Sequence, residues 1–263
     1  MKPKKKTLLI DGDIFIFRAA LLSEHAVEWT EDLWTLHAHK SDAVVNFDNA
    51  IEELKEDLGA TDVIIALSDP VNFRYTVLPT YKHNRKDKRP PLLRQAVKEY
   101  VQERHTCYIR PQLEGDDILG ILATSDVIIK GEKIVVSIDK DMHTIPCTYY
   151  NSDNKTITEI TTLEAQYYHL LQTLTGDASD GYAGCPGIGP KTAEKLLDGM
   201  LQADTTVDGW YMPYWETVVK AYEKAKLTEQ DALTQARVAR ICRKDDYDFQ
   251  KKEVILWTPQ TEC

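Results

Sequence analysis

Short apolar runs that each stop at an aspartate constrain the fold of this chain more than any other feature of its sequence. Thr7–Ile10, Asp62–Leu67 and Lys133–Ile138 have the length and composition of buried strands. Segments with helical apolar spacing lie between them. Strands that alternate with helices predict an α/β fold, in which a central, mostly parallel sheet is flanked by helices.

The rest of the chain first extends this pattern and then changes it. We expect a mostly helical stretch over 14–58, a short strand over 107–110, a hairpin around Tyr149 and Ile157, and helices over 92–104, 116–123 and 162–175. Later elements are mainly helices, over 192–197, 214–225 and 228–242, with a final strand over 254–257. This change predicts a core over 1–175 and a mostly helical second part over 176–263.

Carboxylates follow three of the expected strands. Asp11 comes after the first, Asp69 after the second, and Asp139 and Asp141 after the strand over 133–138. A single aspartate at such a place is usually a turn or helix-cap residue. Three in succession would meet at one edge of a parallel sheet, where ligands bind, and their mutual repulsion would require a cation.

Two further acidic clusters suggest the same chemistry. Glu114-Gly-Asp116-Asp117 also fits the acidic first turn of a helix, and Gly176-Asp177-Ala-Ser-Asp180 also fits a capped loop. The candidate metal ligands are therefore nine carboxylates: Asp11, Asp69, Glu114, Asp116, Asp117, Asp139, Asp141, Asp177 and Asp180. Oxygen ligands without Cys or His suit hard cations such as Mg²⁺ or Mn²⁺. Two such ions form the usual clamp for phosphodiester hydrolysis.

A glycine-rich turn has the composition of a phosphate grip. In Gly187-Ile-Gly189-Pro-Lys191-Thr192, two glycines precede an expected helix, so backbone N–H groups can approach a phosphate near the helix N-terminus. GIGPKTA before an apolar helix is similar to the hairpin segment of helix-hairpin-helix proteins that bind the DNA backbone. An ordinary glycine turn before a capped helix would have the same residues. Such a motif grips phosphate without reading bases.

Charge is unevenly distributed along the chain. The net charge of −10 argues, taken alone, against a nucleic-acid binder. Residues 74–110, however, contain ten basic and three acidic residues, so this window carries +7 and the remainder −17. A basic block inside an acidic protein is either an electrostatic footprint for an anion or a solvated face.

Composition excludes some classes of protein. No apolar run approaches the length of a membrane span, and the apolar run that ends at Asp11 is too short for a signal peptide. The five cysteines are scattered and form no CxxC pair, which disfavours zinc ribbons and disulfide scaffolds and fits a reducing cytosol.

In chain order these motifs resemble the 5′-nuclease superfamily, which includes flap endonucleases and 5′→3′ exonucleases. The resemblance runs from about residue 7 to 200 and is carried by Asp11-Gly12, Asp69, Tyr81-Lys82-His-Asn84-Arg85, LEGDD, DKDMHTIP, GDASDGYAG and PGIGPKTA. These details look most like the double-strand-specific 5′→3′ exonucleases of short-tailed bacteriophages. The resemblance implies a PIN-like nuclease core with a helix-hairpin-helix subdomain.

The same resemblance implies metal-binding roles. The first ion would be held by Asp69, Glu114 and Asp116, with Asp11 nearby through water. The second would be held by Asp116, Asp139 and Asp141, supported by Asp177 and Asp180. Asp117 would be an outer residue.

It also implies DNA contacts. The basic window matches the arch or clamp under which the free 5′ strand passes, where Lys82 and Arg85 would stabilise charge on the scissile phosphate. Tyr81 would stack on a terminal base, or be an ordinary core or surface tyrosine. The further DNA contacts would be Lys86, Lys88 and Arg89 in the window and Gly187, Gly189, Lys191 and Thr192 in the hairpin segment, with a monovalent cation such as K⁺ beside the latter.

The chain departs from the family pattern in two places that matter here. Many members have Asn or Ser two residues after the first aspartate, where this chain has Asp13. Asp13 is then an additional outer acid or simply a cap. The basic window is short, so we expect the helices of the arch to be reduced.

Two other interpretations compete with a nuclease. A haloacid-dehalogenase-type phosphatase would use Asp11 of LLIDGD as a covalent nucleophile beside one Mg²⁺, but it leaves GIGPKTA and the basic window without a purpose. A non-catalytic DNA-binding protein would leave nine acids unexplained, because uncompensated acids near DNA weaken binding.

We therefore expect a metal-dependent exonuclease that hydrolyses double-stranded DNA from its 5′ ends by a two-metal-ion water attack. Flap endonuclease activity and removal of the RNA strand from RNA–DNA hybrids are expected as well. The cofactor would be two Mg²⁺ ions, with Mn²⁺ as a substitute. The enzyme would work without a membrane, in the cytoplasm (that of the bacterial host if a phage encodes it), and the sequence specifies no oligomeric state.

Overall fold

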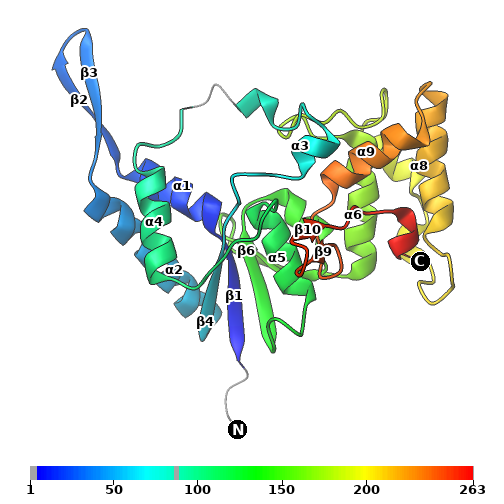
Figure 1. Ribbon diagram of the computed structural model, residues 1–263, viewed down its shortest axis with the longest axis horizontal. Helices are drawn as coiled ribbons and strands as arrows, with labels where there is room; N and C mark the ends of the chain where they lie inside the picture. The colour runs from blue at the N-terminus through cyan, green and yellow to red at the C-terminus, as the bar shows by residue number, and fades with distance from the viewer. Residues whose placement is uncertain (1–4, 86–88, 263) are drawn as a thin grey trace.

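The computed structural model describes residues 5–85 and 89–262, and its centre is a six-stranded sheet (Figure 1). The strand order is β5-β4-β1-β6-β7-β8. The strands are β1 (Lys6–Asp11), β4 (Asp62–Ala66), β5 (Cys107–Tyr108), β6 (Glu132–Ser137), β7 (Cys147–Asn151) and β8 (Thr156–Ile160). All neighbours pair in parallel except β7 and β8, which form an antiparallel hairpin. The predicted mostly parallel central sheet is confirmed.

Side chains of the central strand β1 alternate between two hydrophobic cores. Leu8 and Ile10 pack on one face of the sheet, whereas Leu9 packs on the other. All three are fully buried. Burial on both faces explains why β1 is a continuous apolar run instead of an alternating one.

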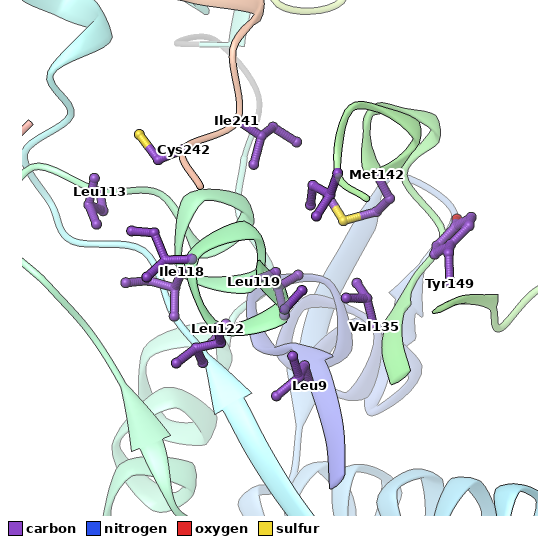
Figure 2. Packing of buried hydrophobic residues seen from close by; sticks show 14 of the residues in the cluster. Leu9, Leu113, Ile118, Leu119, Leu122, Val135, Met142, Tyr149, Ile241 and Cys242 are labelled. Carbon is purple, nitrogen blue, oxygen red and sulfur yellow. The ribbon is translucent and has the colours of Figure 1, made fainter. Parts of the chain in front are cut away.

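Helices cover both faces of the sheet. α1 (Gly12–Leu22), α2 (Lys40–Leu58) and α4 (Arg94–Arg104) pack on the face of Leu8 and Ile10. α5 (Gly115–Thr124) packs on the face of Leu9 (Figure 2). The chain returns to that second core after its last long helix, where Ile241 and Cys242 pack against α5.

From residue 162 onward the described chain is mostly helical. It contains α6 (Thr162–Thr175), α7 (Pro190–Leu196), α8 (Met212–Lys224) and α9 (Glu229–Ala239). These helices enclose a third core that includes Trp215, Tyr222 and Trp257. Leu170 and Leu174 of α6 belong to this core, so packing is continuous across residue 175. The division into 1–175 and 176–263 stays a prediction.

A hairpin replaces part of the predicted helical stretch over 14–58. β2 (Glu24–Thr30) and β3 (Leu33–Ala38) pair antiparallel between α1 and α2 and project from the body (Figure 1). The prediction of helix was wrong here. Cross-strand pairs such as Glu28 with Trp34 hold the hairpin together, whereas its large apolar side chains Trp29, Leu33, Trp34 and Leu36 are exposed.

Short elements complete the described chain. In the basic window, besides α4 and β5, lie α3 (Arg74–Val77) and the 3₁₀ turn η1 (His83–Arg85). Residues 86–88 lie outside the described residues, and the reduced arch stays a prediction. The other short elements are η2 (Lys140–Thr144), η3 (Met200–Gln202), β9 (Tyr247–Asp248), β10 (Glu253–Val254) and η4 (Pro259–Glu262). The predicted strand over 254–257 is thus only β10, which pairs with β9 outside the central sheet. Within the described part of the chain, no helix has the length and apolar character needed to cross a membrane.

Candidate active site

The predicted meeting of strand-end carboxylates takes place. β4, β1 and β6 are parallel neighbours, so Asp69, Asp11 and Asp139 lie at the same edge of the sheet. Asp11 and Asp139 are also helix caps: Asp11 accepts from the Ile14 N–H and Asp139 from the Asp141 N–H. Asp69 instead accepts from the N–H of the distant Gln112. The capping and the clustering interpretations therefore both hold for Asp11 and Asp139.

A cleft of about 430 Å³ opens at this edge. Glu114 is the N-cap of α5 and Asp116 lies in its first turn, so the helix carries both side chains to the strand ends. The cleft is lined by five of the predicted acids, Asp11, Asp69, Glu114, Asp116 and Asp139, and by Lys82 and Arg85. The five acids alone come from four separate segments of the sequence.

A second, smaller cavity adjoins the first. Asp141 and Asp180 line it, together with Glu114 and Asp116, which also line the main cleft. Glu114 and Asp116 therefore lie between the two groups of carboxylates. Asp177 lies in neither lining. Its carboxylate caps the turn at Ser179 and pairs with Lys140.

Burial and repulsion change the pKa of the central acids. Burial raises the pKa of Asp11 to about 7, and the charges of Asp13 and Asp139 add to this rise, although a hydrogen bond from Ser137 opposes it. Burial raises the pKa of Asp141 to about 7, again with help from Asp139. Burial and the charges of Asp11 and Asp139 raise the pKa of Asp116 well above its ordinary value. The ionised carboxylates are thus crowded in a poorly solvated place.

Lys82 and Arg85 are bound to the acids at the edge of the cleft. The Lys82 Nζ lies 2.6 Å from Glu114 Oε1 and 3.6 Å from an Asp180 oxygen, and Arg85 pairs with Asp180. Burial alone would raise the pKa of Glu114, but the charges of Lys82 and Arg74 outweigh it and hold the pKa at about 2. The two predicted phosphate contacts therefore face the acids directly.

A buried ion pair anchors the acidic helix. Arg74 donates to both oxygens of Asp117, at 2.7 and 2.8 Å, and to the carbonyls of Val238 and Arg240. Asp117 also accepts from the backbone N–H groups of Glu114 and Cys242. Asp117 is fully buried and lines neither cavity. Both of its carboxylate oxygens are occupied by Arg74 and backbone N–H groups, and the outer role implied by the resemblance stays a prediction. We call this arrangement the Arg74–Asp117 clasp.

In this structure Tyr81 is a core tyrosine, the second of the two interpretations that its sequence left open. Its ring is only 4% exposed, and its hydroxyl contacts Glu114 and Asp180, each at 2.9 Å. Tyr81 thus positions two acids. Tyr75 lies 6.1 Å from it between ring centroids, lines the cleft and is 48% exposed. Sequence reasoning missed Tyr75 because a tyrosine on a four-residue helix carries no periodic signal.

The remaining predicted DNA contacts differ in their surroundings. Arg89 is bound to Glu24 of the hairpin by two hydrogen bonds. Lys86 and Lys88 lie outside the described residues. Gly187, Gly189, Lys191 and Thr192 are all exposed at the start of α7, while Ala193 and Leu197 fix this helix in the third core. The glycine segment is therefore exposed to solvent, and its role as a phosphate grip stays a prediction.

The carboxylates fit a hard divalent cation by their chemistry, although they are not arranged as a finished coordination shell. Within residues 5–85 and 89–262, no three His, Cys, Asp or Glu side chains surround a common point in metal-binding geometry. Lys82, Arg85 and Lys140 pair with oxygens that would be needed. The donor set is nevertheless all-oxygen and clustered around one cleft, as Mg²⁺ or Mn²⁺ requires.

Comparison with known proteins decides the family. The family model "5′-3′ exonuclease, N-terminal resolvase-like domain" matches residues 6–168, which include the strand-end acids and the acidic helix. The chain belongs to the 5′-3′ exonuclease family. This result excludes the haloacid-dehalogenase interpretation. It also explains why so many acids gather at one edge of the sheet, where each alone would be read as an ordinary turn residue.

Two phage exonucleases match nearly the whole chain, and a flap endonuclease matches about half of it. The chain is 31% identical to the exodeoxyribonuclease of Enterobacteria phage T3, over 98% of this chain and 94% of the relative. Identity to the exonuclease of Escherichia phage T7 is also 31%, over 97% of this chain and 94% of the relative. The flap endonuclease Xni of Shewanella pealeana is 32% identical over 55% of this chain and 60% of its own length.

Solved structures share the fold. A bacteriophage T5 flap endonuclease, in a complex with DNA and metal ions, superposes with a TM-score of 0.60 at 15% identity, over 89% of this chain and 93% of the other. A second structure of the T5 protein, co-crystallised with metal ions, has a TM-score of 0.58 with the same identity and coverage. The α/β core and the helical second part are therefore those of a known 5′-nuclease fold.

Proposed function

We propose that this protein is a divalent-metal-dependent 5′→3′ exonuclease that removes 5′-phosphorylated mono- or short oligonucleotides from double-stranded DNA. The observation that carries the proposal is the cleft in which five carboxylates from four segments meet Lys82 and Arg85. Family membership and near full-length similarity to phage exonucleases support it. Similarity to flap endonucleases supports action at flaps, and we extend the proposal to the RNA strand of RNA–DNA hybrids.

The acids would hold two metal ions in two groups. Asp69, Glu114 and Asp116 would hold one, with Asp11 nearby, and Asp116, Asp139 and Asp141 the other, supported by Asp177 and Asp180. Bound there, two Mg²⁺ ions would supply an activated water and stabilise the leaving oxygen. Mg²⁺ as the native ion, Mn²⁺ as its substitute, and K⁺ beside the glycine segment are parts of this proposal.

The chain's own residues would bind and orient the DNA. Lys82 and Arg85 would leave their acidic partners and contact the scissile phosphate, where positive charge favours the transition state. Their proximity to Glu114 and Asp180 keeps them beside the reacting group. The exposed glycine segment before α7 would hold the backbone of the duplex without reading its bases.

A cleavage assay on matched DNA substrates tests the proposal. We would label the 5′ end of a strand and place it in blunt, nicked, gapped and flapped duplexes, then incubate each with Mg²⁺, Mn²⁺ or EDTA. We expect release of labelled mono- or short oligonucleotides with either metal and none with EDTA. Full-length label on every substrate in the presence of both metals would overturn the nuclease proposal.

Two variants separate metal binding from DNA binding. Asp116→Ala should abolish cleavage and leave DNA binding largely intact, because Asp116 lies between the two acid groups. Lys82→Ala should slow single-turnover cleavage more than it weakens binding, because its charge acts mainly on the transition state. Unchanged turnover in Asp116→Ala would contradict its role as a shared ligand.

A further inference from the structure

Asp13 and Arg94 form an ion pair at the rim of the cleft that the metal-binding proposal does not use. Asp13 lies in the first turn of α1 and Arg94 is the first residue of α4. Both line the same cleft as the strand-end acids.

The two oxygens of Asp13 have different partners. Oδ2 accepts a hydrogen bond of 2.8 Å from the Ser68 N–H. The Ser68 hydroxyl in turn accepts from the Gly115 N–H at 2.9 Å. Ser68 thus joins Asp13 of α1 to the start of the acidic helix α5. Oδ1 lies 3.9 Å from an Arg94 guanidinium nitrogen, which is beyond hydrogen-bond distance. Asp13 therefore attracts the Arg94 guanidinium by charge, while it accepts no hydrogen bond from the Arg94 N–H groups.

The cations of the cleft are not equivalent. Lys82 and Arg85 contact Glu114 and Asp180 at hydrogen-bond distance. Arg94 faces Asp13 on α1 instead, and its side chain is 48% exposed. Among the residues that the structure describes in this cleft, Arg94 is the cation for which the structure shows no hydrogen bond to an acid. Its planar guanidinium suits two-point contact with a phosphate.

The helix itself gives no stability reason for a cation at this position. A positive charge in the first turn of a helix is opposed by the helix dipole, and an exposed pair at 3.9 Å contributes little. Arg94 is directed into a cleft that a negatively charged strand would enter. Its free donors and its position point to the substrate.

We propose that Arg94 binds a backbone phosphate of the substrate strand next to the scissile one, and that Asp13 is the residue that positions Arg94 for this contact. The inference rests on the proposed nuclease function. It adds a second phosphate contact, made by α4 beside α1, to the contact proposed for Lys82 and Arg85. Arg94 is a binding residue, and Asp13 acts through it.

DNA affinity without metal is the primary readout. We would measure the Kd of a fluorescent duplex with a short 5′ flap by anisotropy in EDTA, over a series of salt concentrations. The variants are Arg94→Ala, Arg94→Lys, Asp13→Asn and the double variant, with Lys40→Ala as the matched control. Lys40 is the exposed first residue of α2, lies outside the basic window and does not line the cleft. Thermal unfolding of each variant verifies that it is folded.

We expect Arg94→Ala to weaken binding roughly tenfold or more and to reduce the slope of log Kd against log salt by about 0.7–0.9, the contribution of one phosphate contact. Arg94→Lys should keep the salt slope but lose part of the affinity, because it keeps the charge and loses the planar fork. Lys40→Ala should stay within about twofold of the wild type, because this exposed lysine lies outside both the cleft and the basic window. Single-turnover cleavage at saturating DNA should change less than Kd does.

A double-mutant cycle tests the role of Asp13. Asp13→Asn keeps an oxygen for the Ser68 N–H but removes the charge that attracts Arg94. We expect it to weaken binding in the wild-type background and to have no effect in the Arg94→Ala background. Additive losses, or tighter binding by Asp13→Asn, would overturn the positioning role. An unchanged salt slope in Arg94→Ala would overturn the phosphate contact. If the wild type neither binds nor cuts DNA, the proposed function itself fails, which is a separate result.

Discussion

At the residue scale, the central acids of the cleft are arranged for function at a cost in stability. Asp116 is half-buried in the cleft near Asp11 and Asp139, and the three charges repel one another. Buried like charges destabilise a folded protein unless a cation joins them. Neighbouring cations offset the charge of other acids, as Lys82 does for Glu114, but burial still dominates at Asp116.

Asp116→Asn should therefore stabilise the metal-free protein while it abolishes cleavage. Removal of one buried charge should raise the free energy of unfolding by about 0.5–2 kcal/mol, which corresponds to a rise in Tm of roughly 2–6 °C for a chain of this length. Thermal unfolding in EDTA measures this change. Added Mg²⁺ should raise the Tm of the wild type but have little effect on the variant. A lower Tm in EDTA would show that the Asp116 carboxylate is needed for the fold.

Several residues of the site were predictable because they sit in local motifs. Asp11, Asp69 and Asp139 follow recognisable strands, so the topology of a parallel sheet brings them together. Arg74 was not predictable as a buried residue. It was counted in the basic window, yet it is 2% exposed, because its partner Asp117 lies 43 positions further along the chain. A pair so distant in sequence leaves no local pattern.

At the element scale, the close packing of α5 depends on a glycine. An added Cβ at Gly120 would lie 2.3 Å from the carbonyl oxygen of Cys242. Gly120→Ala should therefore destabilise the protein by about 1–3 kcal/mol through overpacking, with a fall in Tm. Chemical denaturation at equilibrium measures the loss.

Gly189→Ala provides the matched glycine control. An added Cβ at Gly189 meets nothing within 4 Å, so this variant should keep the wild-type stability. It should weaken DNA binding, because the new methyl group would stand where the backbone approaches a phosphate. If both variants lost the same stability, tight packing could not be what makes Gly120→Ala destabilising.

The β2–β3 hairpin is the element that sequence reasoning missed. Its apolar residues are not arranged to face a core, so the usual signal of burial periodicity is absent and the segment was assigned to a helical stretch. None of its side chains belongs to the buried hydrophobic clusters. The elements with buried faces, such as β1, β6 and α6, were predicted close to their observed bounds.

Replacement of residues 25–37 by a short Gly-Ser linker should leave the body of the protein folded. The replacement removes no core contact, so the free energy of unfolding should change by well under about 1 kcal/mol. We therefore expect Tm to change by no more than about 2 °C. Far-UV circular dichroism and thermal unfolding provide the readout. Loss of the cooperative transition would indicate that the hairpin contributes to the core after all.

At the scale of the whole molecule, net charge is a poor guide to DNA binding. The −10 of the chain combines an acidic body with a basic window of +7. Fewer cations of the window face a ligand than its charge of +7 suggests, since Arg74 is buried in the clasp and Arg89 is bound to Glu24. The remaining cations must compete with nearby acids for the phosphate backbone.

We therefore expect DNA binding to depend strongly on salt. Between about 50 and 200 mM salt, Kd should rise roughly tenfold or more, as counterion release predicts for a few phosphate contacts. Tm over the same range should change little, because the cores are apolar and exposed ion pairs contribute little to stability. Anisotropy titrations with the protein in EDTA measure the first quantity. A Kd that does not depend on salt would contradict electrostatic binding by the window.

The Arg74–Asp117 clasp also sets an order of events during synthesis. The clasp needs the carbonyls of Val238 and Arg240 and the N–H of Cys242, which leave the ribosome long after every acid of the cleft has been made. A nascent chain that ends before residue 238 holds all nine acids but lacks the backbone groups that fix the acidic helix. Competence to cut DNA should then arise only when translation is nearly finished, so stalled or truncated products would be inert toward the nucleic acid around them.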